Sequence, residues 1–187
     1  HRHRTGNLIM SFLSRYRLKE LTIFVFGALL LFSEINYHIA FSGIYILITG
    51  MLLTSSSLIL SPTQGALSLI PIALYIDSRV PIPFGSSLII LIGLHFAIVL
   101  FRSHIQRETD GLAIATALFA NLAIHLGYSL FSRVYVGTVS IDPMLISVNA
   151  LCSSLVVALL YTLYSRTVLE ILGIFGVNVN QEPRRKR

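Results

Sequence analysis

The chain has 187 residues, of which 55% are hydrophobic and 12% are charged, and its formal net charge is +6. A typical soluble domain has about 25% charged residues, so this chain has too few polar side chains to cover a surface that faces water. Its mean hydropathy of +0.79 is typical of an integral membrane protein. The single cysteine, Cys152, excludes an internal disulfide and a metal site made of several thiolates.

The apolar segments predict six membrane-spanning helices. A hydrocarbon core about 30 Å thick requires roughly 20 apolar residues per helix. The predicted helices cover residues 21–33, 39–54, 64–76, 84–101, 112–131 and 144–164. Pro71 predicts a kink in the third helix, and residues 55–60 are expected to extend a neighbouring helix.

The sequence therefore predicts an all-α integral membrane protein built as a bundle of six transmembrane helices. The helical domain covers residues 21–164 and follows a basic segment at residues 1–20. Residues 165–187 combine apolar and basic side chains, which predicts a tail at the membrane surface, in contact with anionic lipids.

The positions of the basic residues predict the orientation. With six spans, 12 of the 14 basic residues lie on one side of the membrane: Arg2, Arg4, Arg15, Arg17, Lys19, Arg102, Arg107, Arg166, Arg184, Arg185, Lys186 and Arg187. The other side receives Arg79 and Arg133. Because Lys and Arg accumulate in cytoplasmic loops, both termini are expected in the cytoplasm. No basic groove with interleaved aromatic residues indicates a nucleic-acid partner.

The stretch from Tyr75 to Gly85 interrupts two apolar segments. Two prolines prevent a continuous helix, and Gly85 permits backbone angles that other residues resist. Asp77 ends the third helix, where the helix dipole is negative, so we expect a cation or a hydrogen-bond donor as its partner. Two roles remain open for Asp77 and Arg79. They recognise another protein, or they fix the approach of the third and fourth helices.

Polar residues on two predicted spans indicate buried contacts. Asn121, His125 and Tyr128 follow one another at spacings of four and three, so they share one helix face, which is expected to point into the bundle. This face forms hydrogen bonds between helices, or Asn121 and His125 line a pocket for a polar ligand. His95, in the middle of the fourth span, is expected to bond a neighbouring helix.

The sequence lacks the motifs of the common catalytic membrane proteins. It contains no H-E-x-x-H, no paired intramembrane aspartates, no G-x-S-x-G turn, no phosphate-binding loop and no Cys/His cluster with metal-ligand spacing. We therefore predict a protein that is not an enzyme and that uses no metal and no cofactor.

The order of several features resembles a known family. Gly65 lies in an apolar helix, Leu74 to Asp77 end that helix, Pro83, Phe84 and Gly85 open the next one, and Arg107 and Glu108 precede the fifth. This order resembles the rod shape-determining MreD family of bacterial inner-membrane proteins. Phe84 stands where leucine is common in that family, and residues 70–73 stand where its glycine run is usual.

The resemblance implies a non-catalytic component of the machinery that elongates the cell wall, located in the bacterial inner (cytoplasmic) membrane. Members of the family bind the bitopic protein MreC and connect MreB filaments to the synthase RodA and a penicillin-binding transpeptidase. The candidate residues for partner contact or function are Asp77, Arg79, Pro83, Phe84, Gly85, Asn121 and His125.

A second interpretation is the substrate-binding S component of an energy-coupling-factor vitamin transporter, which is also a bundle of about six helices. In that case Asn121, His125 and Glu34 would line a ligand pocket that opens to the periplasm. Such subunits dock through small residues in the first helix, where this chain has only Gly27 and Ala28.

Overall fold

The computed structural model describes residues 2–80, 82–105, 110–136 and 143–174. All regular structure within these ranges is helical. The elements are α1 (Arg2–Ile39), the 3-10 turn η1 (Ala40–Ser42), α2 (Thr49–Ile59), α3 (Pro62–Asp77), α4 (Ser86–Ile105), α5 (Asp110–Val136) and α6 (Pro143–Ile174).

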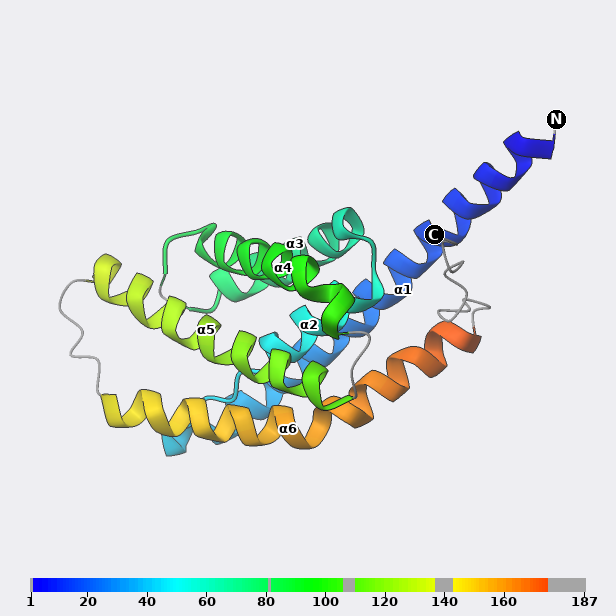
Figure 1. Cartoon of the computed structure of the whole chain (residues 1–187). Coiled ribbons are helices and arrows are strands. Elements are labelled where there is room, and N and C mark those ends of the chain that lie inside the picture. Colours follow the sequence, from blue (N-terminus) through cyan, green and yellow to red (C-terminus); the bar gives the residue numbers. More distant parts are fainter. Residues whose placement is uncertain (1, 81, 106–109, 137–142, 175–187) are drawn as a thin grey trace.

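Successive helices run in opposite directions (Figure 1). The start of α1 and the last turn of α6 therefore lie at the same end of the bundle. At the other end lie η1, the α3–α4 turn, the end of α5 and the start of α6, and we call it the distal end.

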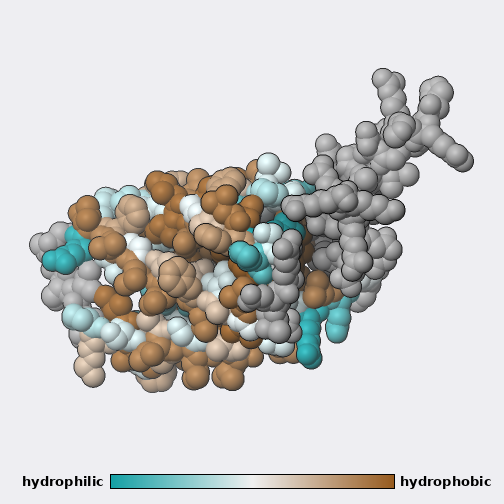
Figure 2. Space-filling model, viewed as in Figure 1, coloured by the Kyte–Doolittle hydropathy of each residue, from teal (hydrophilic) through white to brown (hydrophobic). Residues whose placement is uncertain are grey.

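Four helices are long and apolar enough to cross a membrane: Leu21–Ile39, Ser86–Ile105, Gly111–Tyr135 and Pro143–Ile171. Hydrophobic side chains cover most of the face in Figure 2, and the most hydrophilic groups lie mainly toward its two ends. An exposed apolar belt on helices of this length is what contact with lipid requires. The protein is therefore an all-helical membrane protein.

The short helix α2 lies at the centre of the molecule. Nine of its 11 residues are buried, and it packs against α3, α4, α5 and α6. Gly50 allows the closest of these contacts, because a Cβ atom there would lie 2.6 Å from the Ala117 carbonyl oxygen and against the Asn121 backbone. Small residues of this kind let two helix backbones touch in lipid.

The prediction of a continuous helix over residues 39–54 is wrong. The chain leaves η1 at Gly43, which has a φ of +73°, and residues 44–48 have no regular structure before α2 begins at Thr49. Apolar composition alone does not distinguish a helix from a short non-helical segment whose backbone is hydrogen-bonded by distant side chains. Residues 55–59 extend α2, as the sequence led us to expect.

Other helix ends also differ from the predicted ones, and the first helix begins at Arg2 instead of residue 21. Helix α1 continues past the predicted end at Ser33 to Ile39. Helix α3 begins at Pro62, after Ser61, whose Oγ accepts a hydrogen bond from the Gln64 amide at 3.4 Å. The apolar residues that we assigned to the tail continue α6 to Ile174. Residues 106–109, 137–142 and 175–187, which include Arg107 and Glu108, lie outside the described part of the chain.

Candidate functional site

Residues 44–48 form a non-helical segment, which we call the extended segment, and side chains of other helices hold its backbone. Asn36 binds both backbone groups of Ile46: its Oδ1 accepts from the amide at 2.8 Å, and its Nδ2 donates to the carbonyl at 2.7 Å. The Asn149 Oδ1 accepts from the Tyr45 amide at 3.0 Å. Non-helical backbone inside a membrane protein requires such partners, because lipid offers none.

Two further residues complete this arrangement on the inner side. The Ser153 Oγ accepts from the Leu47 amide at 2.9 Å, and the fully buried Asn121 Oδ1 accepts from the Gly50 amide at 3.1 Å. Because Gly50 lies in the first turn of α2, Asn121 satisfies an amide that the helix itself leaves unpaired. The α5 face predicted to point into the bundle therefore stabilises the start of α2.

His125 also bonds across helices, because its Nε2 lies 3.1 Å from the Ser153 Oγ on α6. A histidine and a serine at this distance have the spacing of a base and its nucleophile. Ser153, however, is fully buried, and its oxygen already accepts from the Leu47 amide. The pair therefore holds the extended segment in place and offers no accessible nucleophile.

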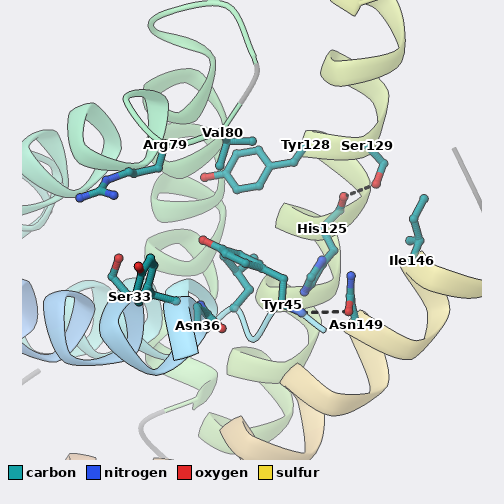
Figure 3. A pocket seen from close by; sticks show the side chains of 12 residues that line it. Ser33, Asn36, Tyr45, Arg79, Val80, His125, Tyr128, Ser129, Ile146 and Asn149 are labelled. Carbon is teal, nitrogen blue, oxygen red and sulfur yellow. Dashed lines mark hydrogen bonds between the residues drawn. The ribbon is translucent and has the colours of Figure 1, made fainter. Parts of the chain in front are cut away.

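A cleft of about 480 Å³ lies beside the extended segment at the distal end. We call it the distal cleft. Its walls come from α1, residues 45–47, the end of α3, α5 and the start of α6 (Figure 3). Its polar lining includes Asn36, Tyr45, Arg79, His125, Tyr128 and Asn149. The cleft thus combines two sequence candidates, Arg79 and His125, that are 46 positions apart, whereas Asn121 and Glu34 are absent from its lining.

Arg79 is exposed in the α3–α4 turn, two residues after α3 ends. Its guanidinium carbon lies 5.5 Å from the centroid of the Tyr75 ring, which is a cation–π contact. It forms no ion pair with a described residue, and in particular none with Asp77. Asp77 and Arg79, two residues apart, therefore do not pair with each other in the described part of the chain.

Asp77 instead holds the turn between α3 and α4. Its side chain is only 7% exposed. Its Oδ2 accepts from the Gly85 amide at 2.6 Å and its Oδ1 from the Ser87 amide at 3.0 Å. These are the donors that the sequence required, and they place a carboxylate at the positive N-terminal end of α4. Gly85 has a φ of +94°, as predicted for this turn.

The remaining turn candidates differ in exposure. Phe84 is 76% exposed, and Pro83 is partly buried. The sequence candidates thus form two groups. Asp77, Pro83, Phe84 and Gly85 build the α3–α4 turn, whereas Asn121 and His125 serve the extended segment.

His95 connects three elements in the interior, as the sequence predicted for a bond to a neighbouring helix. It is fully buried. Its Nε2 lies 2.8 Å from the Pro62 carbonyl, and its Nδ1 lies 2.8 Å from the Ser57 Oγ. Since a carbonyl only accepts, Nε2 carries the proton. The ring also packs against Gly65, where an added Cβ would meet it.

The sequence analysis missed Asn36, Asn149 and Ser153. Asn149 and Ser153 are four residues apart in an apolar span, which is the same spacing as between Asn121 and His125 on α5. That shared spacing is the signal that would have found them, because residues four apart lie on one helix face. Asn36 gave no such signal, since it lies beyond the predicted end of the first span at Ser33.

Metal ligation and similarity to known proteins give no further lead. Among the described residues, no three His, Cys, Asp or Glu side chains lie close enough together to hold a metal ion. No family model, curated protein or solved structure matches the chain.

Proposed function

We propose that this protein is a non-catalytic scaffold of the bacterial machinery that elongates the cell wall, with a role like that of the MreD family. The α3–α4 unit carries this proposal. Gly65 packs against His95, and Asp77 accepts from the Gly85 amide. The residues that resemble the family thus serve one structural purpose, which is to join α3 to α4 in a fixed geometry.

The use of the interior polar groups favours a scaffold over an enzyme. Asn121, Ser153 and Asn36 accept hydrogen bonds from backbone amides, and His95 binds a carbonyl and a serine. Catalysis requires groups that converge on a reacting atom, whereas these groups converge on the backbone. They give the bundle a fixed shape, which is what a docking platform for other membrane proteins needs.

The proposed topology has six crossings, and the second crossing is discontinuous. Extended residues advance about 3.3 Å and helical residues about 1.5 Å. Residues 44–59 therefore cover at most about 33 Å, and this upper bound is close to the hydrocarbon thickness of about 30 Å. Six crossings and the positions of 12 of the 14 basic residues support a topology in which both termini lie on the cytoplasmic side of the inner membrane.

Reporter fusions test this topology. A fluorescent protein fused to the C-terminus is expected to be bright, because it folds in the cytoplasm. Alkaline phosphatase inserted after Gly137 is expected to be active, because it requires the periplasm. Periplasmic activity of a C-terminal phosphatase fusion would contradict the six-crossing topology.

The proposed partner is a bitopic MreC-like protein, through which the scaffold would reach MreB, RodA and a penicillin-binding transpeptidase. The exposed Phe84 on the fixed turn gives it an anchor, since aromatic side chains contribute strongly at interfaces. Arg79 is exposed near the same turn.

Co-purification tests the proposal. The full chain carries an affinity tag and is expressed in a rod-shaped bacterium, and membrane proteins captured with it are identified by mass spectrometry. We expect the MreC-like protein, with capture reduced at least tenfold by Phe84→Ala. Phe119→Ala is the matched control, because Phe119 is similarly exposed, at 73%, on the side of α5. Capture of no elongation protein by the unmodified chain would overturn the proposal.

The distal cleft favours a second candidate, the substrate-binding S component of an energy-coupling-factor transporter. Its volume of about 480 Å³ is in the range of small-molecule sites, and discontinuous helices often form such sites in transporters. Capture of transporter ATPase subunits in the same experiment, without an MreC-like protein, would favour this candidate.

A further inference from the structure

The distal cleft is preformed. Its walls come from five separate parts of the chain, and hydrogen bonds fix the backbone between them. Asn36 and Asn149 hold opposite sides of the extended segment through Ile46 and Tyr45. A ligand that enters the cleft therefore does not have to order these elements, which lowers the free-energy cost of binding.

The charge of the cleft favours an anion. Its twelve lining residues include Arg79 and contain no Asp or Glu. Arg79 has no acidic partner among the described residues, and the contact that its guanidinium makes there is with the ring of Tyr75. A guanidinium presents a planar set of donors that matches a carboxylate or a phosphate.

The remaining polar groups of the cleft also include donors with spare capacity. The Asn149 Oδ1 accepts a hydrogen bond from the Tyr45 backbone amide, and the Asn149 Nδ2 has no partner among the described residues. The Tyr45 hydroxyl likewise has no described partner. In Figure 3 the hydroxyl ends of Tyr45 and Tyr128 lie on the side of the Arg79 side chain, and the Tyr45 residue is 42% exposed whereas Tyr128 is 8% exposed. Donors next to aromatic rings suit a planar molecule that carries acceptor oxygens.

We propose that the distal cleft binds a small organic anion, whose carboxylate or phosphate pairs with Arg79 and whose planar body lies against the exposed ring of Tyr45. This inference goes beyond the scaffold function. It concerns the isolated chain, so its failure leaves the co-purification result unaffected, and the reverse also holds.

The test uses the full chain in detergent micelles and measures its melting temperature. The probes are indole-3-acetate and its amide, which have the same shape and differ in charge, together with inorganic phosphate and phosphatidylglycerol. We expect the melting temperature to rise with the acid in a saturable manner and to change much less with the amide.

Variants locate the effect. Arg79→Gln is expected to weaken binding of the acid at least tenfold, because it removes a charge-assisted hydrogen bond. Arg133→Gln is the matched control, since Arg133 is exposed at the same end of the bundle and does not line the cleft. Tyr45→Phe is expected to weaken binding by a smaller factor, whereas Tyr135→Phe is expected to leave it unchanged.

Three outcomes would overturn the proposal. The first is no rise in the melting temperature with the acid or with phosphate. The second is an equal rise with the acid and the amide that persists in Arg79→Gln. The third is a rise with phosphatidylglycerol alone, which would make Arg79 a residue that contacts the bilayer.

Discussion

The extended segment 44–48 and the α3–α4 turn solve the same physical problem in different ways. Both carry backbone amides that no helix satisfies, and both receive side-chain acceptors. The segment is held by neutral side chains, among them Asn36, Asn149 and Ser153. The turn is held by the carboxylate of Asp77.

The difference follows the position of each region along the bundle. The segment leads inward to Gly50, which contacts Asn121 near the middle of α5. An ionised group is costly at that depth, whereas an amide or a hydroxyl is tolerated once it is bonded. Asp77 lies at the end of α3, where the N-terminus of α4 provides a positive potential. A neutral acceptor therefore serves at Gly50, deep in the bundle, whereas the Asp77 carboxylate, which is as buried as Asn36 at 7% exposed, relies on the positive potential at the N-terminus of α4.

The largest expected effect concerns Gly50, where the extended segment enters the core. Gly50→Ala should destabilise the protein by about 3 kcal/mol, because its Cβ would press on the backbone of α5 and separate two helices. Gly93→Ala is the control, since a Cβ at Gly93 meets nothing within 4 Å. Unfolding by a denaturing detergent measures both variants. Equal stability of the two would show that α2 and α5 do not touch at this point.

The second effect tests the neutral acceptors. Asn36→Leu removes both hydrogen bonds to Ile46, and we expect a loss of about 2 kcal/mol, because two backbone groups lose their partner. Asn149→Leu removes one bond, to the Tyr45 amide, and should cost about half as much. Denaturation midpoints provide the measurement, and the reverse order of the two losses would contradict this assignment.

The third effect tests the charged acceptor. Asp77→Asn should destabilise the protein by about 1 kcal/mol, in the range measured for helix caps. The substitution replaces one acceptor oxygen by an NH₂ donor, which would face a backbone amide that is also a donor. Water at the distal end limits the loss. Glu34→Gln is the control, since Glu34 is an exposed acid of α1. A larger loss of stability for Asp77→Asn than for Asn36→Leu would contradict this order of the two acceptors.

The smallest effect concerns the turn backbone. Gly85→Ala should cost about 1 kcal/mol, because an L-residue resists a φ of +94°, although a Cβ there meets nothing within 4 Å. Gly27→Ala in α1 also meets nothing within 4 Å and should be neutral or slightly stabilising. Thermal unfolding separates the two, and no loss for Gly85→Ala would mean that the turn relaxes.

Local features of the sequence predicted the parts of the site that depend on neighbouring residues. The turn belongs to this group, because Asp77 and the amides it binds are 8 and 10 residues apart. The inward face of α5 also follows from helical spacing. The function and the partners remain proposals, since neither helix geometry nor hydropathy specifies them.

By itself, the sequence determined the membrane class, most of the helical segments and the turn at Asp77 and Gly85, because composition, period and turn chemistry act over short distances. Only the tertiary structure decided where the second apolar segment unwinds. Two amides of that segment are bonded by residues 104 and 106 positions away, and the first turn of α2 by a residue 71 positions away. An apolar run alone predicts a helix, because its sequence does not reveal these distant partners. In the folded chain their hydrogen bonds hold a non-helical backbone beside the distal cleft.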